Sequence, residues 1–221
     1  MKLVDQLNRN LNKTLQKGRV ALTYPKGCPS IALHLFDVAV LEGPLSHDEA
    51  QAVVAEPAYW SFSWASGQVL SEFILSNPAL VRGKVMADFG SGSGIVAIAA
   101  AKAGAKKVYA CDTDTDALDA VKANALANKV NISTVENFKE IDEALDLITA
   151  ADVLYDPDNL GFLDFFHQQA KQVLLADSRI KKLPSEHYLL QTTVEARTWP
   201  DLNEFEEFNQ VRIYLSQNGK K

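Results

Sequence analysis

Residues 84–94 read KVMADFGSGSG, and this stretch predicts how the centre of the chain folds. The mainly apolar run at 84–89 has the length of a short strand, and it stops at three glycines spaced two residues apart. Glycines directly after a strand let the backbone turn sharply and let a ligand approach the main chain and the amino terminus of the next helix. The stretch therefore predicts a strand, loop and helix that hold a nucleotide cofactor beyond the strand end.

Regular alternation of strands and helices surrounds this unit from about residue 56 onward. Further strand-like runs lie at 107–111, 132–136, 145–154, 172–176, 187–194 and 211–215, and helical periods cover 67–76, 95–103, 116–128 and 158–171. Such alternation forms βαβ units and a mainly parallel sheet. The last two strand candidates have no helix between them, which indicates a closing antiparallel hairpin. The predicted fold class is α/β, with a doubly wound, Rossmann-like sheet of seven strands.

The first part of the chain reads differently from this alternation. A leucine at every fourth position from Leu3 to Leu15 predicts an amphipathic helix that packs on the main domain, and an organellar transit peptide is the alternative reading of this basic segment. The run IALHLFDVAVL at 31–41 alternates and predicts one or two strands of a small antiparallel element. We therefore expect an N-terminal appendage over 1–55 and the main α/β domain over 56–221.

Composition narrows the classes of function. The chain has 22 Lys and Arg against 28 Asp and Glu, a formal net charge of −6, whereas nucleic-acid-binding domains usually carry a basic surplus. Its two cysteines and four histidines show no spacing typical of a metal site or a disulfide framework. No apolar run has membrane length, and no signal-peptide core is present. We expect a soluble, cytoplasmic protein without a metal, a nucleic-acid partner or a membrane partner.

The glycine loop by itself is compatible with two classes of cofactor. Gly92–Ala97 also satisfies the G-x-G-x-x-A dinucleotide fingerprint, and Asp112 lies 20 residues after Gly92. Asp88 discriminates between them, because a carboxylate at the mouth of the loop repels a pyrophosphate but favours S-adenosylmethionine, which carries an ammonium and a sulfonium instead of phosphates. Asp112 at the end of the second strand can accept hydrogen bonds from both ribose hydroxyls. We predict S-adenosylmethionine as the cofactor, and an NAD-dependent oxidoreductase is a distant alternative.

The second motif is Ala-Asp-Val-Leu-Tyr-Asp at 151–156, where the fourth strand ends and the doubly wound fold faces the transferable group. Enzymes that methylate amino groups of nucleic acids usually have Asn/Asp-Pro-Pro-Tyr/Phe there, whose prolines stiffen the loop under a flat base. Here Asp152 and Tyr155 keep the spacing without the prolines. An anionic and an aromatic side chain suit a flexible alkyl-ammonium acceptor. The alternative is a strand-end aspartate beside a tyrosine that only packs.

The third motif is the aromatic stretch YWSFSWASGQ at 59–68. Trp60 and Phe62 are expected in the hydrophobic core. Trp64 and Gly67 lie next to a helix start, and we expect them to wall the cofactor pocket.

Together these motifs resemble the seven-stranded, class I lysine methyltransferases typified by the electron-transfer-flavoprotein β-subunit lysine methyltransferases, and more loosely the bacterial ribosomal-protein lysine methyltransferases. The resemblance covers roughly residues 29–180, and its most specific stretches are 29–33, 59–68, 76–84, 88–94, 112–114 and 152–156. It implies the strand order 3-2-1-4-5-7-6 and a monomeric or weakly associating enzyme, with Asp152 and Tyr155 bordering the acceptor lysine. The predicted cofactor site comprises Trp64, Gly67, Asp88, Gly90, Ser91, Gly92, Gly94, Asp112, Thr113 and Asp152.

The predicted function is protein-lysine N-methylation, by in-line attack of a neutral amine on the cofactor methyl group, with a protein partner that carries the lysine. The chain departs from the family pattern at Ala65-Ser66, where Pro-Gly is usual, and at Ala-Asp-Ser-Arg over 176–179, where Gly-Asp-Pro-Gly-Arg is usual. These segments adjoin the cofactor and substrate sides, so the substrate stays open. The alternatives are a small-molecule amine N-methyltransferase of the same fold and a non-catalytic, cofactor-binding interaction protein.

Overall fold

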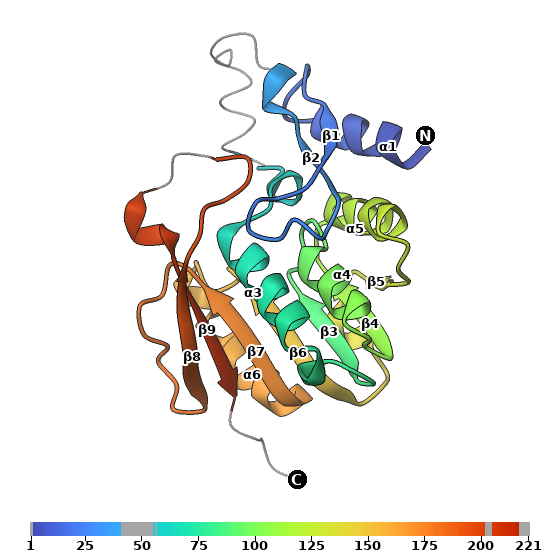
Figure 1. Cartoon of the computed structure of the whole chain (residues 1–221). Coiled ribbons are helices and arrows are strands. Elements are labelled where there is room, and N and C mark those ends of the chain that lie inside the picture. Colours follow the sequence, from blue (N-terminus) through green and yellow to red (C-terminus); the bar gives the residue numbers. More distant parts are fainter. Residues whose placement is uncertain (1, 41–54, 56, 202–204, 217–221) are drawn as a thin grey trace.

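The structure, a computed structural model, describes residues 2–40, 55, 57–201 and 205–216. Its centre is a seven-stranded sheet in the order β5-β4-β3-β6-β7-β9-β8 (Figure 1). The strands are β3 (Val85–Phe89), β4 (Lys107–Cys111), β5 (Ser133–Val135), β6 (Leu145–Ala151), β7 (Ala170–Asp177), β8 (Tyr188–Glu195) and β9 (Gln210–Ser216). The first five are parallel, whereas β9 pairs antiparallel with both β7 and β8. The predicted strand order, 3-2-1-4-5-7-6 with a closing hairpin, is confirmed.

Helices cover both faces of this sheet (Figure 1). They are α3 (Ala65–Ser76), α4 (Ile95–Lys102) and α5 (Thr115–Ala127) on one face, and α6 (Phe162–Gln169) on the other. Strand β3 shows why both faces are covered, since Met86 packs toward the first group and Val85 and Ala87 pack toward α6. No helix within the described residues is long and apolar enough to cross a membrane.

The appendage consists of one helix and a two-stranded sheet. Helix α1 (Lys2–Leu11) packs on α5, as predicted, and its Leu7 and Leu11 are fully buried there. The two strands, β1 (Val20–Thr23) and β2 (Leu33–Phe36), pair antiparallel. Within its described residues, 31–40, the alternating run thus supplies one strand of the predicted one or two. Its second half turns into a 3-10 helix at Val38–Val40, where the Asp37 carboxylate accepts the Ala39 amide at 3.0 Å.

A buried asparagine ties the appendage to the glycine loop. Asn124 of α5 is fully buried, and its Nδ2 donates to the Ser93 carbonyl at 2.8 Å. Its Oδ1 accepts the His34 amide of β2 at 2.7 Å. The predicted division between 1–55 and 56–221 lies beside residues 41–54 and 56, outside the described residues, and so stays a prediction.

The helix expected over 158–171 is shorter at both ends. A 3-10 turn occupies Pro157–Gly161, and the Asp156 carboxylate accepts the Asp158 amide at its start. Helix α6 then begins at Phe162 and ends at Gln169, because β7 pairs with β6 from Ala170 onward. The helical period of the sequence cannot separate these elements, since the strand pairing that ends the helix comes from residues far away in the chain.

The contact between α1 and α5 predicts a stability cost. Leu11→Ala should lower the free energy of unfolding by about 2–4 kcal/mol, because a fully buried leucine leaves a cavity. Leu126→Ala, on α5 but 68% exposed, is the matched control and should cost under about 0.5 kcal/mol. Urea denaturation of both variants measures the difference. Equal stability of the two variants would mean that the appendage does not fold cooperatively with the main domain.

Candidate active site

The glycine loop directly follows β3, the strand that lies between β4 and β6 in the sheet. Gly90, Gly92 and Gly94 all have positive φ, at 66°, 49° and 80°. A Cβ on Gly90 would lie 2.7 Å from Val153 Cγ1, whereas a Cβ on Gly92 would meet no atom within 4 Å. The loop therefore needs its glycines for backbone conformation, and it leaves open space beside Gly92 for a ligand.

Asp112 connects this loop to the end of β4. Its Oδ2 accepts the Gly92 amide at 2.8 Å, and its Oδ1 accepts the Asp114 amide at 3.0 Å. Burial raises the pKa of Asp112 above its usual range, and the two amides act against that rise. Each oxygen keeps a lone pair for a further donor, which fits the predicted contact with ribose hydroxyls. Thr113 is exposed in the same turn.

Asp88 lies beneath the loop and is 2% exposed. The Thr149 hydroxyl donates to its Oδ1 at 2.8 Å, whereas its Oδ2 is buried without a hydrogen-bond partner among the described residues. Burial raises the pKa of Asp88 to about 7, although the Thr149 hydrogen bond acts in the opposite direction. An unpaired buried carboxylate oxygen is costly, and a nearby cationic ligand group would offset that cost. The residues of the loop thus fit a cofactor that carries positive charge.

Ser91, Trp64 and Gly67, three residues of the predicted cofactor site, contact other parts of the protein. Ser91 is buried, and its hydroxyl donates to the Cys111 carbonyl at 3.3 Å. Trp64 is half-buried, and its Nε1 donates to the Tyr59 carbonyl at 3.0 Å. A Cβ on Gly67 would lie 3.1 Å from Ile95 Cγ2, so this glycine lets α3 approach α4 closely. Their contact with a cofactor stays a prediction.

The aromatic neighbours of Trp64 differ in how deeply they are buried. Trp60 is 2% exposed in the core, and Phe62 is half-buried with its ring 6.0 Å from that of Phe36. Trp60 therefore lies in the core as predicted, whereas Phe62 is only partly buried and packs against the core from its edge.

Asp152 follows β6, and its backbone lies in the left-handed region with φ of 51°. Its Oδ1 accepts three hydrogen bonds, from Ser66 Oγ at 2.7 Å, from Ser178 Oγ at 2.8 Å and from Ser178 N at 3.0 Å. Tyr155 lies in the loop after it and is 59% exposed. Both serines lie in the segments that depart from the family pattern, but no local sequence signal indicates that both contact Asp152.

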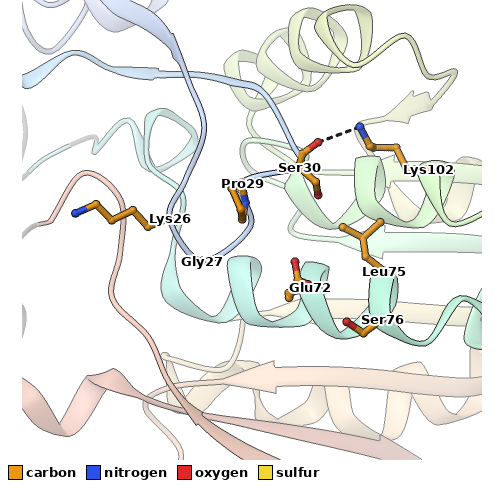
Figure 2. A pocket seen from close by; sticks show the side chains of 8 residues that line it. All are labelled: Lys26, Gly27, Pro29, Ser30, Glu72, Leu75, Ser76 and Lys102. Atoms are coloured by element: carbon orange, nitrogen blue, oxygen red, sulfur yellow. Dashed lines mark hydrogen bonds between the residues drawn. The ribbon is translucent and has the colours of Figure 1, made fainter.

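A separate hollow lies away from these residues, between the loop that follows β1 and the helices α3 and α4 (Figure 2). It has a volume of about 650 Å³ and is lined by Lys26, Gly27, Pro29, Ser30, Glu72, Leu75, Ser76 and Lys102. None of the predicted site residues lines it. Among the described residues, no group of three or more His, Cys, Asp or Glu side chains is arranged to hold a metal ion. The candidate active site is therefore the strand-end edge around the glycine loop.

Comparison with known proteins agrees with this geometry. Residues 69–158 match the family model described as ribosomal protein L11 methyltransferase (PrmA). The chain is 38% identical over 127 residues to the electron transfer flavoprotein beta subunit lysine methyltransferase of Mus musculus, which covers 54% of this chain and 50% of the mouse protein. The predicted resemblance is confirmed over that region. The chain spans about half the length of the curated relatives it matches.

Solved structures give the same fold. The ribosomal protein L11 methylase of Lactobacillus delbrueckii subsp. bulgaricus is 24% identical, with a TM-score of 0.53 over 69% of this chain and 78% of that one. The magnesium protoporphyrin IX methyltransferase of Synechocystis PCC 6803 with bound SAM is 16% identical, with a TM-score of 0.52 over 80% of this chain and 86% of that one. The main domain therefore has the Rossmann-like methyltransferase fold.

The position of Asp112 predicts the effect of its removal. Asp112→Ala should weaken binding of S-adenosylhomocysteine by about 1.5–3 kcal/mol, because charge-assisted hydrogen bonds to the ribose are lost. Asp114→Ala is the matched control, since Asp114 caps α5 by accepting the Asp116 amide at 2.8 Å. The control should cost about 1 kcal/mol of stability and leave affinity unchanged. Titration calorimetry decides, and unchanged affinity in Asp112→Ala would leave that residue a purely structural role.

Asp88 predicts a pH dependence of cofactor affinity. A cationic ligand favours the ionised carboxylate, and the pKa of Asp88 in the free protein is about 7. Below that pH, binding must release the carboxyl proton, so affinity for S-adenosylhomocysteine should fall by up to about tenfold from pH 8 to pH 6. Asp88→Asn can keep the Thr149 hydrogen bond and should flatten the profile. If the affinities of the wild-type protein and of Asp88→Asn fall equally between pH 8 and pH 6, the proton released on binding comes from a group other than Asp88.

Proposed function

We propose that this protein is an S-adenosylmethionine-dependent protein-lysine N-methyltransferase. The observation that carries the proposal is the Asp152 carboxylate at the end of β6. Its Oδ1 is held by three protein donors, whereas its Oδ2 accepts none from the described residues. Asp152 itself is half-buried, and its Oδ2 is not one of the fully buried oxygens without a partner in that part of the chain, which are Ser63 Oγ and Asp88 Oδ2. A fixed carboxylate with one oxygen that no described donor occupies suits an alkyl-ammonium donor.

The cofactor would be held by the glycine loop, by Asp112 and by the charge of Asp88. It supplies, when bound, a methyl group on an electrophilic sulfonium. The chain itself contributes alignment and exclusion of water. Asp152 Oδ2 accepts a hydrogen bond from the lysine ammonium and orients it before its proton passes to water. The neutral amine is then presented to the methyl group in line.

The surroundings of Asp152 support a protein acceptor over a small amine. Tyr155 is 59% exposed, Tyr59 is 50% exposed, and the neighbouring Asp156 and Asp158 are exposed carboxylates. This open, acidic rim can admit a lysine that projects from a folded protein surface, whereas a small amine is usually enclosed. The relatives named as lysine methyltransferases of a protein subunit support the same choice. A small-molecule amine methyltransferase is the second candidate, because the similarity covers about half of those relatives.

Transfer of labelled methyl groups tests the proposal. The purified full chain is incubated with tritiated S-adenosylmethionine and a cell extract, and the products are separated by gel electrophoresis and then hydrolysed to amino acids. Label in a protein band that is recovered as methyl-lysine supports the proposal. Label confined to filterable small molecules would favour the second candidate. Binding of the cofactor without any transfer would indicate an interaction protein.

Asp152→Asn isolates the role of the charge. An asparagine can keep Oδ1 as acceptor for Ser66 and Ser178, and it replaces Oδ2 by an amide nitrogen that cannot accept from an ammonium. We expect methyl transfer to fall by about tenfold or more, with unchanged affinity for S-adenosylhomocysteine. Glu186→Gln is the matched control and should keep most of the activity, because it neutralises an exposed carboxylate before the start of β8, at the edge of the sheet opposite to the strand ends. Wild-type transfer by folded Asp152→Asn would exclude the steering role.

A further inference from the structure

Two serines from distant parts of the chain hold the same carboxylate oxygen. Ser66 lies in the first turn of α3 and is 0% exposed, and Ser178 directly follows β7 and is 5% exposed. Both hydroxyls and the Ser178 amide donate to Oδ1 of Asp152, at distances of 2.7–3.0 Å. The three elements that border the strand-end edge, namely α3, β6 and β7, are thus joined at one oxygen atom.

The arrangement makes the two oxygens of Asp152 unequal. A free carboxylate can rotate about its last bond and exchange them, but three donors on Oδ1 fix the group in one orientation. The main chain is held as well, because the Asp152 amide donates to the Ala176 carbonyl at 3.0 Å. Oδ2 therefore keeps one position and has no donor from the described residues, so the entropy of ordering the carboxylate is not lost when an acceptor binds.

The turn after β7 divides its donors between two carboxylates. Asp177 is 1% exposed, and its Oδ1 accepts the amides of Arg179 and Ile180, at 2.8 Å and 2.7 Å. Ser178 lies between Asp177 and Arg179 in the sequence, but its amide and its hydroxyl donate to Asp152 instead. A proline at that place would have no amide to donate, and neither proline nor glycine has a hydroxyl. The hydroxyls of Ser66 and Ser178 therefore add donors to Asp152 that the Pro-Gly and Gly-Asp-Pro-Gly-Arg patterns lack.

We propose that Ser66 and Ser178 are positioning residues, which hold the Asp152 carboxylate so that its Oδ2 receives the acceptor ammonium. This inference rests on the proposed function and deepens it. Neither serine touches the acceptor, and both act through Asp152. Their loss therefore weakens productive binding of the acceptor while leaving the cofactor contacts in place.

The experiment compares Ser66→Ala, Ser178→Ala and the double variant with the wild-type enzyme on the acceptor protein that the labelling experiment identifies. We expect kcat/KM for the acceptor to fall about three- to tenfold for each single change, mainly through KM. The affinity for S-adenosylhomocysteine should stay within about twofold of the wild-type value. Loss of one charge-assisted hydrogen bond to the cofactor would instead lower it about tenfold. Ser178→Thr keeps both the hydroxyl and the amide and should restore most of the loss.

Ser71→Ala is the matched control. Ser71 is also buried in α3, but its hydroxyl donates to the Gly67 carbonyl of its own helix at 2.7 Å. It should change thermal stability as much as Ser66→Ala does and leave KM unchanged. Wild-type KM in the folded double variant would overturn the positioning role while the proposed function stands, and an equal KM rise in Ser71→Ala would do the same. Absence of any methyl transfer by the wild-type enzyme would overturn both proposals.

Discussion

Parallel pairing of β3 with β4 on one side and β6 on the other is the constraint on which the candidate site depends. Parallel strands end at the same edge of a sheet, so side chains at their carboxyl ends meet there although they are distant in sequence. Asp88, Asp112 and Asp152 stand at the ends of these three strands. The glycine loop leaves the same edge, and Asp112 binds it through the Gly92 amide.

The charge at this edge has a consistent sign. Among the described residues, the donors to these carboxylates are backbone amides and hydroxyls, and the ion pairs lie elsewhere, as in Lys171 with Asp146. In their ionised forms these carboxylates have no paired cation within the described part of the chain and give the crevice a negative potential, to which Asp88 contributes fully above its pKa of about 7. Such a potential favours both a cofactor with a sulfonium and an acceptor with an ammonium. One arrangement of charge thereby serves both proposed substrates.

Local signals explain which features could be predicted. The bounds predicted for β4, 107–111, agree with the strand found at Lys107–Cys111. Its apolar run and the turn residues that follow it are adjacent in the sequence, so a local pattern is enough to predict them. The glycine loop can be predicted for the same reason, because tolerance of a positive φ, as found at Gly90 and Gly94, is intrinsic to glycine. Strand β1 was missed because four residues carry too little periodicity to distinguish a strand from a loop.

The sequence by itself determined the fold class, the strand order through its resemblance to a family, and the residue types at the strand ends. Only the tertiary structure decided that Asp88 is buried with an unpaired oxygen, and that Ser66 and Ser178 meet at Asp152. The serines lie 86 and 26 residues from that aspartate. Hydrogen bonds over such separations depend on which strands pair and how a helix lies across them, and no periodicity or local backbone preference encodes that geometry.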